Sequence, residues 1–399
     1  MIKRCGLALL LFYAISVAQT GTGIEDVGHG DWYCELNIEE DGHIQAAVLS
    51  DDNKYVIGGS FYPLNSDDVQ RSTPRRRSAF FACIDSSGQL LWERKTDLPE
   101  VVAAYKLSNG RIDFVLADIQ SGLRLAVPVS SAGTVGEADT LGYFRDTIEE
   151  RSGDYYLVES EGDQQFSLVK ISNDVTKNWT AGLTGATRDP QIFNMRDELI
   201  VIDRYRPWNS PEDNDGLIKW YCVEKKDGIL EHIGEWQSNT LSSCEQSENE
   251  ILSRKDALLF IFKRWKCKSQ DSDNLSQLVA CTFDSKMELT SIDTLISWLG
   301  SHEDGWFVQS QFYEDSLLVK ETHTNFSLFH CFDQDLNLLW KRRLDRFCPR
   351  TRMQVLPDNA IILFGRINEP SKSGEVCYSG EPSKMFVYKW NPESTPFVE

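Results

Sequence analysis

The segment Ala82–Trp92, with the sequence ACIDSSGQLLW, carries the signal of a β-hairpin. The apolar run AFFACI, residues 79–84, leads into the polar turn Ser86-Ser87-Gly88, and a second apolar stretch then reaches Trp92. Serine and glycine favour tight turns, so polar residues between two β-forming runs favour an antiparallel hairpin. The same arrangement recurs along the chain, and this repetition decides the fold.

Two series of polar turns alternate along the sequence, and each turn is flanked by β-rich runs such as YVIGGSF or KWYCV. The first series consists of Asp51-Asp52-Asn53, Asn109-Gly110, Gly153-Asp154, Arg196-Asp197, Lys255-Asp256, Glu314-Asp315 and Pro357-Asp358. The second consists of Ser86-Ser87-Gly88, Ser131-Ala132-Gly133, Asn173-Asp174, Lys226-Asp227-Gly228, Asp284-Ser285, Asp333-Gln334-Asp335 and Asn391-Pro392. Together, the two series of seven turns predict seven pairs of hairpins.

Seven pairs of hairpins predict seven four-stranded antiparallel units, which is the pattern of an all-β, seven-bladed β-propeller. A β-sandwich or barrel of irregular hairpins is the alternative, and the seven repeats in phase favour the propeller. We expect one domain over residues 19–399, although its length alone would suggest two or three. The predicted blades are 45–97, 99–142, 143–184, 187–236, 246–292, 302–345 and 350–399.

The segment 31–38 resembles an outer strand without a hairpin partner of its own. The last predicted blade ends in the short tail Thr395–Glu399. We therefore predict that 31–38 completes the seventh blade, closes the ring and removes its open edge.

Tryptophan placement supports this phase. Trp92 and Trp340 each lie nine residues after a cysteine, Cys83 and Cys331, and Trp179 holds the same place relative to its turn. A tryptophan that recurs at one blade position favours packing between blades over a ligand platform.

The segment Ala82–Trp92 resembles the Ala-x-Asp-x-x-x-Gly-x-x-x-Trp repeat of quinoprotein-like and WD-repeat-like secreted bacterial propellers, here with one residue fewer before the glycine. Cys331–Trp340 follows the same form without the glycine. The resemblance implies the fold of the whole mature chain and no activity. Quinone-using members carry adjacent cysteines near the cofactor, and this sequence has no Cys-Cys pair, so we expect no quinone.

The composition and the N-terminal segment indicate which partners the protein can have and where in the cell it is located. The chain has 399 residues and a formal charge of −20, which argues against nucleic acid and anionic membrane surfaces as partners. Lys3 and Arg4, the apolar run 6–17 and the small residues before Gln19 predict a signal peptide over 1–18. The apolar run is too short for a membrane span. Removal of the signal peptide takes away Lys3 and Arg4, so the charge changes from −20 to −22. We expect a soluble monomer that is secreted, periplasmic or bound at the cell surface.

Nine of the ten cysteines remain after signal cleavage. Cys83, Cys222, Cys281 and Cys331 precede second-series turns, and we interpret them as small buried residues. Cys244 and Cys267 lie twelve residues before and eleven after Asp256, so a hairpin there would bring them nearly opposite each other. This symmetry predicts a Cys244–Cys267 disulfide.

With both turn series on one face, the longer connections fall on the other: 61–78, 204–217, 236–250, 264–277, 292–306 and 367–383. Loops on a rigid scaffold concentrate binding residues. Basic and aromatic residues gather there, and the predicted ligand-binding residues are Tyr205, Arg206, Trp208, Arg264 and Trp265. Tyr62 and Arg75–Arg77 form a third cluster of this kind. The alternative is that these cations pair with surrounding acids.

Catalytic motifs are absent from the sequence. The histidines show no metal-ligand spacing, and neither a Gly-x-Ser-x-Gly elbow, a Walker loop nor a dinucleotide fingerprint occurs. We therefore expect no metal, no cofactor and no catalytic residue. The leading hypothesis is a non-catalytic exported propeller that binds a protein or carbohydrate through the long-loop face. The second is a polysaccharide hydrolase or lyase that uses carboxylates near the central channel.

Overall fold

A computed structural model describes the chain over residues 31–38, 42–62, 77–107, 109–118, 121, 123–149, 154–160, 166–172, 176–186, 190–195, 197–205, 217–237, 245–254, 257–269, 272–299, 307–323, 326–345, 351–367 and 384–394. At some strand ends, among them 204–205 and 263–269, it describes the backbone alone. The predicted signal peptide, 1–18, lies outside the described residues.

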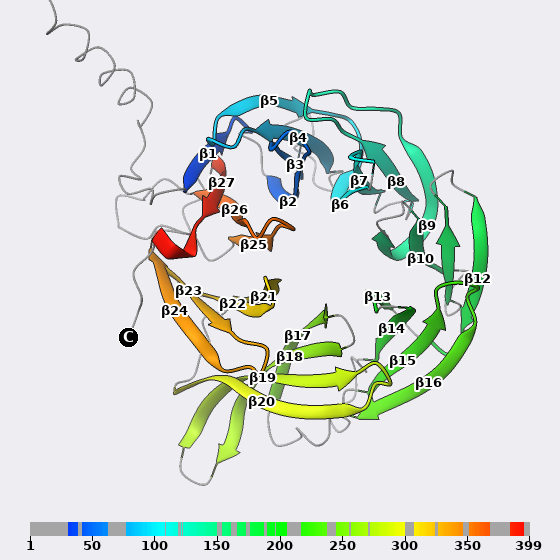
Figure 1. Ribbon diagram of the computed structural model, residues 1–399, viewed down its shortest axis with the longest axis vertical. Coiled ribbons are helices and arrows are strands. Elements are labelled where there is room, and N and C mark those ends of the chain that lie inside the picture. The colour runs from blue at the N-terminus through cyan, green and yellow to red at the C-terminus, as the bar shows by residue number, and fades with distance from the viewer. Residues whose placement is uncertain are drawn as a thin grey trace, which may run out of the picture.

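The described strands form seven antiparallel blades arranged in a ring (Figure 1). Each blade has four strands, with the first nearest the centre and the fourth at the outside. Seven hydrophobic clusters lie between the blades, one for each neighbouring pair. The middle strands are buried on both faces because each blade is covered by two others. The predicted all-β, seven-bladed propeller is confirmed.

The strands have these bounds, blade by blade. Blade one contains β2 (Gly42–Leu49), β3 (Tyr55–Phe61), β4 (Ser78–Ile84) and β5 (Leu90–Lys95). Blade two contains β6 (Glu100–Lys106), β7 (Ile112–Asp118), β8 (Leu123–Pro128) and the start of β9 (Asp139–Glu149); blade three contains the rest of β9, β10 (Tyr155–Ser160), β11 (Phe166–Ile171) and β12 (Lys177–Leu183). Blade four contains β13 (Gln191–Asn194), β14 (Glu198–Tyr205), β15 (Leu217–Glu224) and β16 (Leu230–Gln237). Blade five contains β17 (Glu245–Arg254), β18 (Ala257–Ser269), β19 (Ser272–Asp284) and β20 (Leu289–Leu299). Blade six contains β21 (Phe307–Tyr313), β22 (Ser316–Thr322), β23 (Phe326–Phe332) and β24 (Leu338–Asp345). Blade seven contains β25 (Arg352–Val355), β26 (Ile361–Ile367), β27 (Lys384–Trp390) and β1 (Trp32–Leu36).

Blades two and three share one strand. The first residues of β9 pair with β8 and the later ones with β10, so these two blades form a continuous seven-stranded sheet. The segment TLGYFRDTIE, residues 140–149, contains no polar turn that would divide it into an outer strand of blade two and an inner strand of blade three. The border between the second and third predicted blades, at 142 and 143, falls inside this strand.

The N-terminal strand closes the ring. Figure 1 places β1 beside β27, and the two pair antiparallel from Trp32 opposite Lys389 to Leu36 opposite Met385. Asp31 fixes the entry of β1, because its carboxylate accepts hydrogen bonds from Tyr388 Oη at 2.7 Å and from the Asn391 backbone N–H at 2.5 Å. The predicted closing strand is confirmed, and the ring joins the two ends of the described chain.

Neighbouring inner strands are joined through side-chain amides. The Gln354 side chain accepts from the backbone N–H of Ala47 at 2.8 Å and donates to the carbonyl of the same residue at 2.9 Å. One blade earlier, the Gln309 side chain accepts a hydrogen bond from the Met353 backbone N–H at 2.8 Å. An inner strand has a free edge, and these bonds satisfy backbone groups that sheet pairing leaves open.

Tryptophans join neighbouring blades at the outside of the ring. We call the turn between the third and fourth strands of a blade its outer turn, and the turn between the first and second strands its inner turn. Trp92 of blade one donates a 2.8 Å hydrogen bond from Nε1 to the Ser131 carbonyl in the outer turn of blade two. Its indole covers Gly133 of that turn, where a Cβ atom would lie 3.4 Å from the ring.

The same contact occurs at two further pairs of blades. A Cβ atom at Gly228 would lie 2.5 Å from the ring of Trp179, and one at Gly88 would lie 2.7 Å from Trp32 Cβ. Trp179 also donates from Nε1 to the Lys225 carbonyl at 3.2 Å. The closing strand therefore carries its tryptophan at the position used by other blades. These contacts confirm that the recurring tryptophans pack between blades.

Residue sizes are complementary where the glycine is missing. Met287 and Leu336 occupy the equivalent outer-turn positions of blades five and six, with φ of 61° and 62°. In the preceding blades, the register position of the tryptophan holds His232 and Ser291. Met287 and Leu336 pack into the clusters between these blades. The outer-turn residue is thus larger in the blades that follow an outer strand without a tryptophan at this position.

The strand order defines two faces of the ring. Inner and outer turns share one face, which we call the turn face. The second strands end, and the third and first strands begin, on the opposite face, which we call the long-loop face. Among the described residues, no helix is long and apolar enough to span a membrane.

Replacing Asp31 with alanine is expected to loosen the ring closure first. The change removes two hydrogen bonds to a carboxylate, for an expected loss of about 2 kcal/mol in the free energy of unfolding. Amide hydrogen exchange should accelerate in β1 and β27 before other strands. Asp97→Ala, in an exposed turn of blade one, serves as the control. Equal acceleration in all blades would contradict a local closure.

Candidate functional site

Three of the five predicted ligand-binding residues lie on two neighbouring second strands. Tyr205 ends β14 opposite Leu217, and Arg264 and Trp265 lie in β18 opposite Gln246 and Glu245. Both strands run toward the long-loop face. Arg206 and Trp208 lie outside the described residues, and for Tyr205, Arg264 and Trp265 the backbone alone is described.

The segment 264–277 differs from the prediction of a long connection. It belongs mostly to β18 and β19, which stay paired out to Ser269 opposite Ser272. Figure 1 shows this hairpin projecting from the ring. The segment begins with Arg264-Trp265-Lys266-Cys267, and alternating large and polar residues extend a strand readily. The hairpin presents the basic and aromatic residues at the long-loop face on regular structure.

The cysteines fall into two groups. Cys83, Cys222, Cys281 and Cys331 are buried and not in disulfides, which confirms that they are small core residues. Cys267 lies in β18 opposite Leu275 in the register, and Cys244 lies outside the described residues. The Cys244–Cys267 disulfide stays a prediction.

A cluster of polar residues lies at the inner rim of the long-loop face. Arg77 donates to Tyr62 Oη at 2.8 Å and forms a 2.9 Å ion pair with Glu100, which begins β6. The structure thus brings together Tyr62 and Arg77 of the third basic and aromatic cluster, with an acid paired to the arginine. Arg352, which begins β25, donates to the side chain of Gln45.

Arg352 differs from Arg77 in its partners. Among the described residues, its hydrogen bond goes to the neutral amide of Gln45, and no described acid forms an ion pair with it. Surrounding protein atoms and the positive charge of Arg77 lower the pKa of Arg352. We call Arg352, Arg77, Tyr62, Glu100 and Gln45 the rim cluster. Its two arginines and one glutamate leave the described cluster with one net positive charge.

Blade six carries a buried lysine that is not among the residues predicted from the sequence. Lys320 is fully buried between blades six and seven, where its Nζ donates to Thr322 Oγ1 at 3.0 Å and to the carbonyl of Thr351. Burial lowers the pKa of Lys320 to about 7. Leu317, Leu318 and Val319 come just before it, and all three are buried, so both faces of the strand are covered. This uninterrupted apolar run is the feature of the sequence that indicates a buried position for the next residue.

The next residue, Glu321, points to the opposite interface. Its carboxylate lies 3.5 Å from the Nε2 atoms of both His323 and His330. Burial favours a raised pKa, but the two imidazoles outweigh it and lower the pKa of Glu321 to about 2. The carboxylate therefore stays ionised inside the ring.

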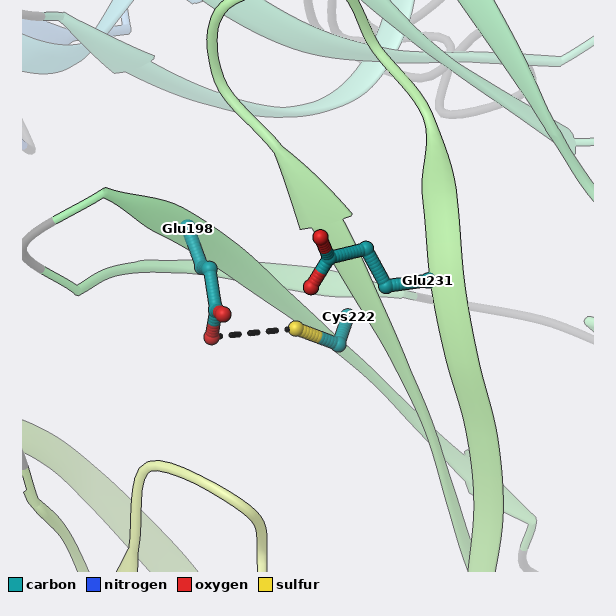
Figure 2. A group of neighbouring side chains, drawn as sticks. All are labelled: Glu198, Cys222 and Glu231. Atoms are coloured by element: carbon teal, nitrogen blue, oxygen red, sulfur yellow. Dashed lines mark hydrogen bonds between the residues drawn. The ribbon is translucent and has the colours of Figure 1, made fainter.

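A thiol and two carboxylates converge on blade four, near the turn face. Figure 2 shows Glu198, Cys222 and Glu231, from β14, β15 and β16, with potential ligand atoms all within 4.8 Å of one another. The thiol of Cys222 donates to Glu198 Oε2 at 3.1 Å, and burial and that carboxylate raise the pKa of the thiol. The hydrogen bond from the thiol to Glu198 accounts for the approach of these two groups, and we interpret the cluster as structural and assign it no metal.

Comparisons with known proteins place the fold. No protein-family model matches the chain, and no curated protein matches it. Among solved structures, the acylaminoacyl peptidase of Pyrococcus horikoshii aligns with a TM-score of 0.51 and 9% identity, over 89% of this chain and 52% of that one. The β-propeller domain of the Trilobed protease from Pyrococcus furiosus gives 0.49 and 10%, over 87% and 93%. Drosophila Semaphorin 1b gives 0.45 and 8%, over 91% and 86%. At these identities the likeness shows a seven-bladed β-propeller and nothing of its activity.

Lys320 should make stability depend on pH. In the unfolded chain the lysine titrates near 10.5, but in the folded protein near 7, so the unfolded state binds more protons between these values. The free energy of unfolding should therefore rise with pH above 7, by at most about 1.4 kcal/mol per pH unit. Lys320→Met removes this contribution, so its advantage over the wild type should shrink from pH 6.5 to 8.5.

Urea unfolding at three pH values in this window measures the effect. Lys95→Met, at an exposed position of β5, is the control and should keep the wild-type slope. A constant difference between Lys320→Met and the wild type across the window would show that Lys320 is charged in the folded protein.

Proposed function

We propose that the protein is an exported, non-catalytic β-propeller that binds a protein partner or a glycan through its long-loop face. The partner carries carboxylate, sulfate or phosphate groups. The observation that carries the proposal is Arg352, an exposed guanidinium at the inner rim whose described hydrogen-bond partner is a neutral amide.

Electrostatics supports an anionic group at this rim. Desolvation is the main cause of the lowered pKa of Arg352, and repulsion by Arg77 adds to it, while Glu100 neutralises the charge of Arg77. An anion bound between the arginines would relieve that repulsion, and a guanidinium binds carboxylate or phosphate through paired hydrogen bonds. The chain has a net charge of −20, so its overall field repels anions. An anionic ligand would therefore bind here through local contacts with the two arginines.

The extent of the face supports a large ligand. The long strands β18 and β19 carry Arg264 and Trp265 toward this face, and β14 ends there at Tyr205. Arg206 and Trp208, which follow Tyr205, remain part of the predicted binding surface. Aromatic rings suit sugar faces or apolar side chains, and arginines add charge recognition.

A polysaccharide hydrolase or lyase is the alternative. Such an enzyme uses a pair of carboxyl groups, one of them with a raised pKa so that it can donate a proton. Among the described residues, the carboxyl group with a raised pKa is that of Glu224, and the charge of Asp227 is the main cause. Glu224 lies at an outer turn, away from the centre of the ring, so this observation does not favour the hydrolase.

The remaining parts of the proposal come from the sequence. The signal peptide predicted over 1–18 supports export to a secreted, periplasmic or cell-surface location, and we propose a monomer. The Trp92 and Trp340 repeats support kinship with quinoprotein-like or WD-repeat-like secreted bacterial propellers, at the level of architecture alone.

The test uses the mature chain, residues 19–399, on an array of neutral and acidic glycans and acidic peptides. We expect binding to acidic probes that weakens with salt, and a loss of at least tenfold in affinity for Arg352→Ala, because the rim then lacks its unpaired charge. Arg343→Ala, which removes an exposed arginine stacked over Phe326 on blade six, is the matched control and should change affinity less than twofold.

Two results would contradict the proposal. One is the absence of binding to every acidic probe. The other is an equal loss for the Arg352 and Arg343 variants, which would assign the binding to net charge rather than to the rim cluster.

A further inference from the structure

A pocket lies on the turn face, opposite the proposed binding face. Its volume is about 580 Å³, within the range of small-molecule sites. The inner turns of blades one and two and the outer turn of blade two line it. The inner turn of blade one is distant in sequence from the two turns of blade two, and it meets them because the two blades are neighbours.

The floor of the pocket is apolar and its walls approach closely. Ile112 and Val129 are 3% and 2% exposed and line the pocket together with Pro128. Two glycines allow the close approach of the walls. A Cβ atom at Gly110 would lie 2.1 Å from Asp51 Oδ2, and one at Gly136 would lie 2.6 Å from the Pro128 ring. A larger residue at either position would clash with the neighbouring wall, so the glycines keep the two blades at this spacing.

Contacts between blades hold the polar groups of the pocket in place. Asp52 accepts a hydrogen bond from Ser131 Oγ of the next blade at 3.0 Å. Lys106 of blade two forms a 2.6 Å ion pair with Asp51 of blade one. Trp92 holds the same outer turn from behind through the Ser131 carbonyl. A site whose polar groups are already fixed binds a ligand with little ordering cost.

The charges of the pocket are already paired. Asp51 pairs with Lys106, and Asp52 pairs with Lys54 at 2.6 Å; hydrogen bonds from Lys54 and Ser50 lower the pKa of Asp52 to about 2. Arg111 pairs with the buried carboxylate of Asp113 at 2.6 Å. The two lining carboxylates outnumber the single guanidinium, so an anionic ligand finds no spare cation here.

Hydroxyl groups complete the lining. Ser130 Oγ accepts from the Thr134 backbone N–H at 3.1 Å, which leaves its own proton available, and Thr134 is exposed at the rim. Carboxylate oxygens accept hydrogen bonds from ligand hydroxyls, while these hydroxyls and Arg111 donate to ligand oxygens. A ligand with many hydroxyl groups and an apolar face of C–H groups matches this combination.

From this geometry we infer that the pocket between blades one and two binds a neutral saccharide of one or two rings. Hydroxyl groups of the sugar bond to Asp51, Asp52, Ser130 and Thr134, and its C–H face lies on Ile112 and Val129. The site is separate from the proposed long-loop face and does not depend on it.

Saturation-transfer NMR on the mature chain tests the inference. The probes are glucose, galactose, mannose, N-acetylglucosamine, maltose and lactose, with glucuronate as an anionic comparison. We expect signal from at least one neutral sugar and weaker signal from glucuronate. Thr134→Phe places a ring over the rim of the pocket and should reduce affinity at least tenfold.

Blade three supplies a matched control. Its outer turn repeats the hydrogen bond of the turn in blade two, from Ser172 N–H to the Thr176 carbonyl at 3.0 Å, compared with Ser130 to Thr134 at 2.9 Å. Thr176→Phe makes the same exposed change away from the pocket and should leave affinity within twofold. Asp51→Asn, which keeps the shape and removes the charge, should weaken binding about fivefold.

Three results would overturn the inference: no neutral sugar gives a signal, Thr134→Phe and Thr176→Phe have equal effects, or glucuronate binds better than every neutral sugar. Arg352→Ala separates the two faces. Sugar binding that survives this substitution and is lost in Thr134→Phe belongs to the pocket. Sugar binding that shows the reverse pattern belongs to the long-loop face and contradicts the pocket.

Discussion

The packing of the outer strand of one blade against the outer turn of the next, through a tryptophan at three of the described pairs of blades, is the contact on which this ring depends. Each blade is a small sheet that is apolar on both faces and has no stability alone. At Trp92 the contact supplies a hydrogen bond to Ser131 as well as apolar burial, so it fixes both the spacing and the rotation of two blades. Trp32 makes the corresponding contact from the closing strand, which ties the ends of the described chain into the same repeat.

Because this contact fixes the turns of one face only, the two faces of the ring suit different kinds of ligand. Short turns on the turn face are held between blades, so a polar group there keeps a fixed position, as Asp52 does against Ser131. Such a face suits a small ligand in a preformed pocket. The long-loop face instead carries the projecting β18–β19 hairpin and the rim cluster around Arg352, which suit a larger partner. One scaffold therefore offers two kinds of binding surface.

Local sequence patterns predict the fold well, because a hairpin and its turn are encoded within about fifteen residues, as in Ala79–Trp92. They also predict the closing strand and the role of the tryptophans. They miss the shared strand β9, where the chain changes blades without a turn. They miss the rim cluster and the pocket for a different reason. Arg352 lies near Gln45, and Asp52 near Ser131, only after the ring closes, and no local pattern contains those distances.

A double-mutant cycle on Trp92→Ser and Gly133→Leu tests the size complementarity between blades most directly. The pair copies the combination found at Ser291 and Leu336. Each single change should lower the free energy of unfolding by about 2–4 kcal/mol, through a lost indole or through overpacking against it. The double variant should lose at least about 1 kcal/mol less than the sum of the two, because the leucine fills the space that the indole leaves. Strictly additive losses would contradict the claim that these contacts hold neighbouring blades together through matched size.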